Sequence, residues 1–382
     1  MPSSALQKIR TPDGAVFGNL KMLVSIVISN YNYEQFLRQA IDSALNQSYS
    51  NIQVVVVDDA STDGSRDIID EYDNIEKCLL GSNLGQNRAL NEGFRLARGE
   101  IVIFLDSDDF LTPDAVALHV ERLRANPKAS KSQGYLRVVD GDGNPGSATI
   151  PRKFFPPGDY KELTLARGIG ALPHTFTSGN AWSSWFLDQV MPLPDDVHDS
   201  APDGCLNSVS TLYGPIEVVE AVVCYYRIHG ENRSVQRFEA NNLRGVLRRA
   251  ADMREYLAAT ARKLGYSIEI GSWHRHMRSW RDQVMARSVF LIDGQTASPK
   301  FRDFVLAPFV SGRTGLAKAL VLSAALFIVW VLPRSLALPF CARMIGYEST
   351  DAALIGHFGF GAATSIPSSK GIKPGDQTPR ES

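Results

Sequence analysis

The sequence predicts an α/β protein in which a mostly parallel sheet carries helices on both faces. Three observations predict it: short apolar runs, segments with helical spacing after these runs, and short connecting loops. Short apolar runs rich in β-branched residues suit strands that are buried on both faces. Segments with apolar residues at helical spacing follow these runs, and the connecting loops are short. In such sheets, ligands bind at the carboxyl ends of the strands.

The first two strands are expected at residues 23–28 (LVSIVI) and 52–57 (IQVVVV), which are short and largely apolar. Residues 33–46 between them have apolar side chains at helical spacing. The pattern weakens afterwards, with a short helix at 63–72 and a weaker third strand at 75–80.

The next three elements have clearer boundaries. Residues 85–98 have helical spacing, and Gly99 is expected to end this helix as a C-cap residue. Residues 101–105 (IVIFL) are the fourth strand. A helix over residues 113–125 follows, with Thr112 as its N-cap and a proline at its first position.

Beyond this helix the pattern is less regular. A fifth strand is expected at residues 133–139, and the Gly- and Pro-rich residues 141–159 are typical of a linker or surface loop. Residues 216–228 form another apolar segment with a β-branched bias.

Composition excludes several classes of protein. The 382 residues include 44% hydrophobic and 21% charged residues, as in a globular protein. The formal net charge of -1 gives no global field for nucleic acid. The four cysteines are widely spaced without a C-x-x-C pair, so we expect neither a zinc site nor a disulfide framework, and a reducing cytosol fits. The polar N-terminus, with no long apolar run after its early charges, predicts no signal peptide.

Acidic clusters follow the second and fourth expected strands. Asp58 and Asp59 end the run VVVVDD, and Asp106, Asp108 and Asp109 lie in LDSDD. Two carboxylates at positions i and i+2 can hold a hard divalent cation, which prefers oxygen ligands. Such an ion would neutralise a leaving diphosphate. The alternative is that these aspartates are ordinary loop or helix-cap residues without a catalytic role.

Four stretches resemble the family 2 glycosyltransferases, which have the GT-A fold with its Rossmann-like sheet. They occur in that family's order over about residues 23–234. The stretches are VSIVISNYNYEQFLRQAIDSALNQSY, VVVVDDASTDGS, SNLGQNRALNEGFRLARGEIVIFLDSDD and YYRIHGENRS. The resemblance implies transfer of a sugar from a nucleotide diphosphate sugar donor.

The resemblance also implies a nucleotide site. Tyr31 would lie against the base, and Asp59 would read the base edge. The residues of this site would be Ser29, Asn30, Tyr31, Asp58, Asp59, Asn83, Gly85, Arg88 and Asp106. Structural alternatives stay open for two of them, since Tyr31 can pack on the sheet edge and Arg88 can be a solvated helix residue.

A divalent cation, Mg²⁺ or Mn²⁺, is the cofactor that the resemblance implies. Asp108 would bind the cation directly, Asp106 would face the ribose or the cation, and His229 would complete the site. A hydrogen-bonded structural role is the alternative for His229.

An inverting transfer needs a carboxylate that takes the acceptor proton. The family usually has Glu-Asp about eleven residues before a glycine. Counting back from Gly214 gives Asp203, which follows Pro202 instead of a glutamate. Asp203 is therefore the expected base, with Asp199 and the pair at 195–196 as rivals and a non-catalytic loop aspartate as the alternative.

A further stretch, GNAW at residues 179–182, resembles the family's acceptor-side loop. Trp182 and Trp185 can stack on a sugar there, and packing in the core is the alternative.

The chain is expected to divide into five parts. They are a flexible N-terminus at 1–20, a GT-A domain at 21–235 with a nucleotide half (21–140) and an acceptor half (141–235), a basic helical region at 236–312, a hydrophobic helix at 313–345 and a flexible tail at 346–382.

The C-terminal third predicts contact with a membrane surface. Residues 319–332 (ALVLSAALFIVWVL) are uncharged, but a spanning helix needs about 20 apolar residues. Residues 237–313 contain fourteen basic and seven acidic side chains, a net charge of +7, which favours an anionic surface. We expect a cytoplasmic protein, peripheral at the inner face of the plasma membrane. A buried core helix is the alternative.

The sequence thus predicts an inverting glycosyltransferase. UDP is the first candidate for the nucleotide, and a saccharide or lipid-linked hydroxyl is the acceptor, in surface polysaccharide or glycoconjugate synthesis. A catalytically silent nucleotide-sugar-binding module stays open. A nucleotidyltransferase also stays open, although no Gly-rich phosphate loop follows a strand.

Overall fold

The computed structural model describes residues 21–168, 175–194, 202–229, 240–266 and 316–348, together with a few residues between 284 and 306. The rival bases at 195–196 and Asp199 and the predicted flexible N-terminus at 1–20 lie outside the described residues. So does the predicted tail at 346–382, except residues 346–348, which end the last described helix.

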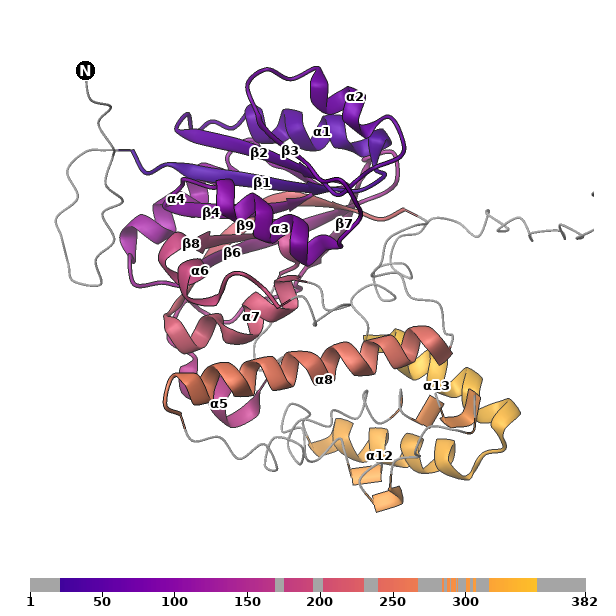
Figure 1. The fold of residues 1–382 in the computed structure, drawn as a ribbon. Helices are drawn as coiled ribbons and strands as arrows, with labels where there is room; N and C mark the ends of the chain where they lie inside the picture. Colours follow the sequence, from indigo (N-terminus) through magenta and orange to yellow (C-terminus); the bar gives the residue numbers. More distant parts are fainter. Residues whose placement is uncertain are drawn as a thin grey trace, which may run out of the picture.

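In the described part of the chain, nine strands form one mixed sheet (Figure 1). Eight of them follow the order β3-β2-β1-β4-β8-β6-β9-β5, and β7 pairs with β6. The strands are β1 (Val24–Asn30), β2 (Ile52–Asp58), β3 (Glu76–Leu79), β4 (Ile101–Asp106), β5 (Phe110–Leu111), β6 (Lys131–Val139), β7 (Pro145–Ile150), β8 (Asn180–Ser183) and β9 (Ile216–Arg227).

The predicted α/β class is confirmed, and the strand directions change halfway across the sheet. Strands β3, β2, β1 and β4 run parallel, as do β6 and β9. Strand β8 is antiparallel to both β4 and β6. Antiparallel pairing also joins β5 to β9 and β7 to β6. The parallel strands on one side are the apolar runs of the sequence, because parallel sheets are buried on both faces.

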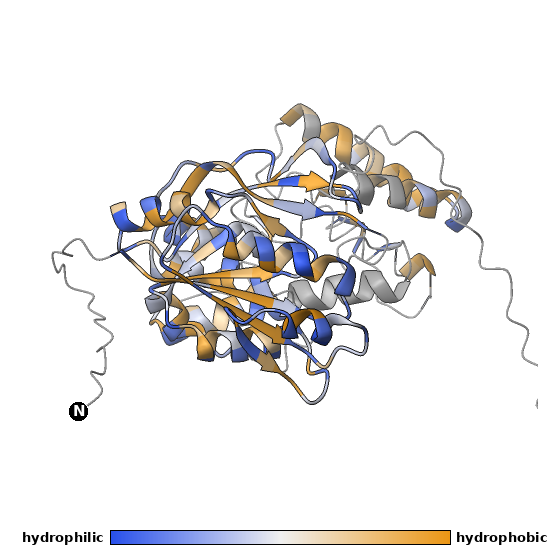
Figure 2. Cartoon of the chain, turned by 90° about the horizontal axis from the view of Figure 1, so that it is seen from above, coloured by the Kyte–Doolittle hydropathy of each residue, from blue (hydrophilic) through white to orange (hydrophobic). Residues whose placement is uncertain are grey.

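Helices cover both faces of the sheet (Figure 1). Successive residues of β1 alternate between two cores: Ile26 packs with Leu37 of α1, whereas Val27 packs with Leu90 of α3. The helices are α1 (Glu34–Leu45), α2 (Ser65–Asp70), α3 (Gln86–Leu96), α4 (Ala115–Ala125), α5 (Lys161–Arg167), η1 (Thr177–Gly179), α6 (Ser184–Val190), α7 (Pro202–Tyr213), α8 (Ala240–Lys263), α12 (Leu316–Val331) and α13 (Arg334–Glu348). Figure 2 shows predominantly hydrophobic central strands beside helices that are partly hydrophilic.

Three predicted boundaries were wrong. The predicted linker or loop at residues 141–159 contains a strand, β7, which pairs with β6. The small residues of β7 did not indicate a strand. Helix α4 begins at Ala115 rather than at Pro113. Helix α3 ends at Leu96, so Gly99 is not its C-cap. Gly99 instead lets the backbone pass close to β1, since a Cβ there would lie 2.5 Å from the Ser25 amide nitrogen.

The C-terminal helices form a small core of their own. Helices α12 and α13 are separated at Leu332 and Pro333, and they pack through Leu326, Val329 and Cys341. None of the helices within the described residues is long and apolar enough to cross a membrane.

A single methyl group tests how closely α3 packs on the sheet. A Cβ at Gly93 would collide with Val27 of β1 and would lie 3.2 Å from Val57 of β2. We expect Gly93→Ala to lower the free energy of unfolding by about 1–3 kcal/mol, because overpacking forces the neighbours to shift. Urea denaturation measures the loss. Gly81→Ala is the control, since nothing lies within 4 Å of its added Cβ, and equal losses would contradict this packing.

Candidate functional site

The ends of three adjacent parallel strands form the framework of the site. In the sheet register, Asn30 of β1 lies beside Asp58 of β2, and Ser29 lies beside Asp106 of β4. The carboxyl ends of β2, β1 and β4 therefore share one edge, as the strand pattern predicted. Both acidic clusters begin at this edge.

Asp58 is fully buried and holds the loop that follows β2. One carboxylate oxygen accepts hydrogen bonds from Asn30 Nδ2 at 3.0 Å and from Ser61 Oγ at 2.5 Å. The other oxygen accepts from the Ser61 amide at 3.0 Å and from Arg66 Nε at 2.8 Å. Asp58 therefore fixes the end of β1 and the next loop.

Asp59 holds a second segment, at the start of α3. Its Oδ1 accepts the Leu84 amide at 2.8 Å, and its Oδ2 accepts the Gly85 amide at 2.7 Å. The next residue, Gln86, donates from Nε2 to Asp106 Oδ1 at 2.7 Å. Residues 84–86 thus connect the two acidic clusters directly. Sequence reasoning missed Gln86. Its position directly after Gly85 was the one feature of the sequence that could have indicated a role in the site.

The other expected nucleotide residues lie in or next to this segment or, for Tyr31, just after β1. Gly85 has φ +88°, a conformation that favours glycine. Asn83 Oδ1 accepts the Gly85 amide at 3.2 Å. Tyr31, just beyond β1, is 38% exposed and so has a side chain that can contact a ligand. Arg88 on α3 pairs with Glu92 at 3.5 Å, as expected for a helix-surface residue.

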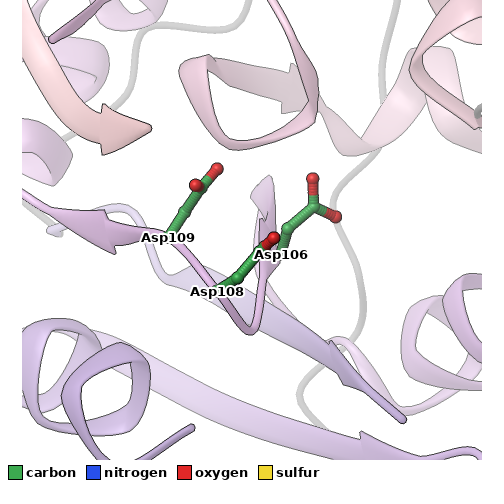
Figure 3. Close-up of side chains that lie close together, drawn as sticks. All are labelled: Asp106, Asp108 and Asp109. Atoms are coloured by element: carbon green, nitrogen blue, oxygen red, sulfur yellow. The ribbon is translucent and has the colours of Figure 1, made fainter. Parts of the chain in front are cut away.

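Three carboxylates meet after β4. Asp106, Asp108 and Asp109 each offer an oxygen within 4.8 Å of the others (Figure 3). His229, at the end of β9, lies with Nε2 3.1 Å from Asp108 Oδ2. The structure therefore brings together Asp106, Asp108 and His229, the three residues predicted as metal ligands.

Asp109 differs from its two neighbours. It is buried, and its oxygens accept hydrogen bonds from Ser178 Oγ at 2.6 Å and from the Arg227 amide at 3.0 Å. Burial raises the pKa of Asp109 well above its usual range, and the charges of Asp108 and Asp106 raise it further. Asp109 therefore joins the acidic turn to β9 and η1.

Arg227 is a second residue that sequence reasoning missed. Its guanidinium carbon lies 4.6 Å from the ring centroid of Phe36 and 5.3 Å from that of Phe110. Its Nε donates to the Asp108 carbonyl at 2.9 Å, and its terminal nitrogens donate to Gly141 O and Gln39 Oε1. Burial lowers its pKa. Arg227 fixes the backbone of the acidic turn.

Asp203, the expected base, lies in the first turn of α7. The side chain is buried, and its Oδ1 accepts the Gly204 amide at 2.9 Å. Burial raises the pKa of Asp203 to about 6, whereas the positive charge of Lys131 lowers it. Trp182 has only 1% exposure and packs on Phe186, so this tryptophan is a core residue.

Comparisons with known proteins identify the class. Residues 25–180 match the family described as Glycosyl transferase family 2. An uncharacterized glycosyltransferase of Nostoc sp. is 34% identical over 226 residues, which are 58% of this chain and 69% of that protein. Chondroitin synthase of Escherichia coli is 32% identical over 222 residues, 57% of this chain and 30% of that protein.

Two further proteins are similar to this chain over a smaller and a larger share of its length. The putative teichuronic acid biosynthesis glycosyltransferase TuaG of Bacillus subtilis is 34% identical over 131 residues, 33% of this chain and 52% of that protein. The structure of the mannosyltransferase PcManGT from Pyrobaculum calidifontis, in complex with GDP-Man and Mn²⁺, has a TM-score of 0.48 at 18% identity, covering 88% of this chain and 87% of that chain.

The fold is an α/β sheet with acidic side chains at the ends of its parallel strands, and the relatives define the class of enzyme. The chain belongs to glycosyl transferase family 2, and it is a glycosyltransferase. The resemblance seen in the sequence motifs is confirmed.

The Arg227 contacts generate a stability prediction. Lysine keeps the charge at position 227 but cannot reproduce the planar fork that reaches three acceptors. We expect Arg227→Lys to cost about 1–3 kcal/mol in the free energy of unfolding, because the buried cation at this position loses hydrogen-bond partners and its contacts with two aromatic rings. Guanidinium denaturation measures it. The surface substitution Arg38→Lys is the control, and an Arg227→Lys midpoint as high as that of the control would refute this role.

Proposed function

We propose that the enzyme moves a sugar from a nucleoside diphosphate sugar to a hydroxyl of a saccharide or lipid-linked acceptor, with inversion at the anomeric carbon. UDP is the first candidate for the nucleotide. The bonding of residues 84–86 to both Asp59 and Asp106 carries the proposal, because it connects the residue that would read the base with the cluster that would face the diphosphate.

The donor nucleotide would lie across the ends of β1, β2 and β4. The half-exposed ring of Tyr31 is available to stack on the base. The Asp59 carboxylate already accepts two amides and retains lone pairs for a base edge. Ser29 and Asn30 would lie beneath the nucleotide, while Asn83 and Arg88 would line the sugar and diphosphate.

The acidic turn fits a divalent cation, Mg²⁺ or Mn²⁺. Asp106 and Asp108 supply carboxylate oxygens and His229 supplies Nε2, a donor set suited to such an ion. Burial raises the pKa of Asp109, and the neighbouring charges of Asp108 and Asp106 raise it further; this crowding of negative charge favours a cation here. A bound cation would neutralise the diphosphate as it leaves.

Asp203 would accept the proton of the acceptor hydroxyl. A carboxyl group with a pKa near 6 is mostly ionised at neutral pH and is more basic than an exposed aspartate. The oxygen of the acceptor then attacks the anomeric carbon as the bond from that carbon to the diphosphate oxygen breaks. One displacement by one base inverts the anomeric configuration.

The C-terminal helices support contact with a membrane surface. One side of α12 and α13 packs inward, while the other exposes large apolar side chains. The exposed residues are Leu316, Leu320, Val321, Phe327, Ile328, Val331, Leu336 and Phe340. Such a patch is unusual for a surface facing water. A peripheral position at the inner face of the plasma membrane, in surface polysaccharide or glycoconjugate synthesis, would suit a lipid-linked acceptor.

The metal site predicts cation-dependent nucleotide binding. Isothermal titration with UDP should give measurable binding in Mn²⁺ and weak binding in EDTA. Asp108→Asn should weaken binding in Mn²⁺ by about tenfold or more, because a ligand loses its charge. Asp73→Asn, an exposed acid in the turn before β3, should bind like the wild type. Equal affinities in all four experiments would refute the site.

The base predicts a pH dependence. Asp203 accepts a proton only when ionised, so hydrolysis of a UDP-sugar should fall as pH drops below about 6. Asp203→Asn should lower turnover by about 100-fold or more and should leave UDP binding unchanged. Turnover of Asp203→Asn equal to the wild type would remove Asp203 as the base.

The exposed apolar patch predicts vesicle binding. Val321 and Val331 are 69% and 60% exposed, so their substitution should not disturb the helix packing. We expect Val321→Ser/Val331→Ser to reduce cosedimentation with phosphatidylglycerol vesicles, because less apolar area reaches the acyl region. Leu264→Ser, an exposed leucine just after α8, is the control. Undiminished cosedimentation of the double variant would count against the patch.

A further inference from the structure

A fully buried lysine interacts electrostatically with the expected base, Asp203. Lys131 begins β6 and is only 1% exposed, which is rare for lysine. Its Nζ donates to Gln133 Oε1 at 2.8 Å, to Asn180 Oδ1 at 2.9 Å and to Asn207 Oδ1. An ammonium has three N–H donors, so these three amide oxygens satisfy it completely.

The amide groups around Lys131 are held in one orientation. Asn180 Nδ2 donates to the Phe176 carbonyl at 2.7 Å, and Asn207 Nδ2 lies 3.4 Å from the Thr175 carbonyl. Because these carbonyls occupy the amide nitrogens, both amide oxygens must face the ammonium. The site is therefore built for a cation at this position.

Lys131 connects three parts of the site. Asn180 belongs to β8 and directly follows η1, whose Ser178 bonds to Asp109 and to the Asp106 amide. Asn207 belongs to α7 and lies four residues after Asp203, on the same helix face. The ammonium thus lies between the segment that supports the acidic turn and the helix that carries the expected base.

We propose that Lys131 is a positioning residue for the transfer reaction, which holds α7 against β8 through Asn207, one turn after Asp203, and presents a buried positive charge to the Asp203 carboxylate. This inference rests on the proposed function, because it takes Asp203 as the base.

The charges nearby are consistent with this role. Lys131 contacts amide oxygens and the face of Trp182, with the ring centroid at 5.2 Å, so none of these contacts cancels its charge. Burial lowers the pKa of Lys131 to about 7, and the charge of Asp203 raises it. Burial raises the pKa of the Cys205 thiol to about 12, so that group is neutral, and Asp252 of α8 acts on this thiol.

Two substitutions separate the charge from the packing. Lys131→Met keeps the length of the side chain and removes the charge. Lys131→Gln also removes the charge but keeps a side-chain amide that can still donate to the surrounding amide oxygens. Ser132→Ala is the matched control, because Ser132 is the buried neighbour on the same strand and bonds to His119 on the opposite face.

The direct test is the titration of the Asp203 carboxyl carbon by NMR in the whole chain. Removing the Lys131 charge should raise the midpoint by about one pH unit in Lys131→Met and Lys131→Gln, with no change in Ser132→Ala. The acid limb of UDP-glucose hydrolysis in Mn²⁺ should move to higher pH by the same amount. If Lys131→Met does not fold, Lys131→Gln decides the outcome.

The outcomes separate this inference from the function on which it rests. An unchanged Asp203 midpoint in the folded charge variants overturns the role of Lys131, whatever the hydrolysis rates. A shifted midpoint together with full hydrolysis by Asp203→Asn would show that the coupling exists and that Asp203 is not the base.

Discussion

The site depends on one interaction, the acceptance of two backbone amides by the Asp59 carboxylate. These hydrogen bonds, from Leu84 and Gly85, hold the segment before α3 across the end of β2. Gln86 can then reach Asp106 at the end of β4. The parallel register puts the two carboxylates at one edge, and the segment converts that edge into a connected site.

Buried ionisable groups hold the rest of the site, and each has its hydrogen-bond partners. Asp58 and Asp109 accept bonds from neighbouring loops, while Arg227 and Lys131 donate to carbonyl and amide oxygens. A buried charge without partners would cost several kcal/mol. Burial is the main cause that raises the proton affinities of Asp109 and Asp203, and the neighbouring charges adjust them. Structure and chemistry are coupled here because the groups are shielded from water.

The sequence predicted the first four strands and both acidic clusters because their signals are local. A run such as VVVVDD specifies a buried strand and its polar end within a few residues. Gln86, Arg227 and Lys131 were missed because their roles arise from contacts between distant segments: Arg227 lies 119 residues from Asp108, and Lys131 lies 76 from Asn207. The strand β7 was missed for a related reason, since its small residues carry little apolar pattern and pairing with β6 supplies the order.

We expect the ends of β1, β2 and β4 to hold one nucleotide and one cation together. The most direct measurement is a crystal structure of the protein with UDP and Mn²⁺, in which the metal is located by its anomalous scattering. We expect the anomalous peak between Asp106, Asp108 and His229, with the uracil beside Tyr31 and the diphosphate between them. A peak away from these side chains, or a nucleotide bound at another edge of the sheet, would contradict the account.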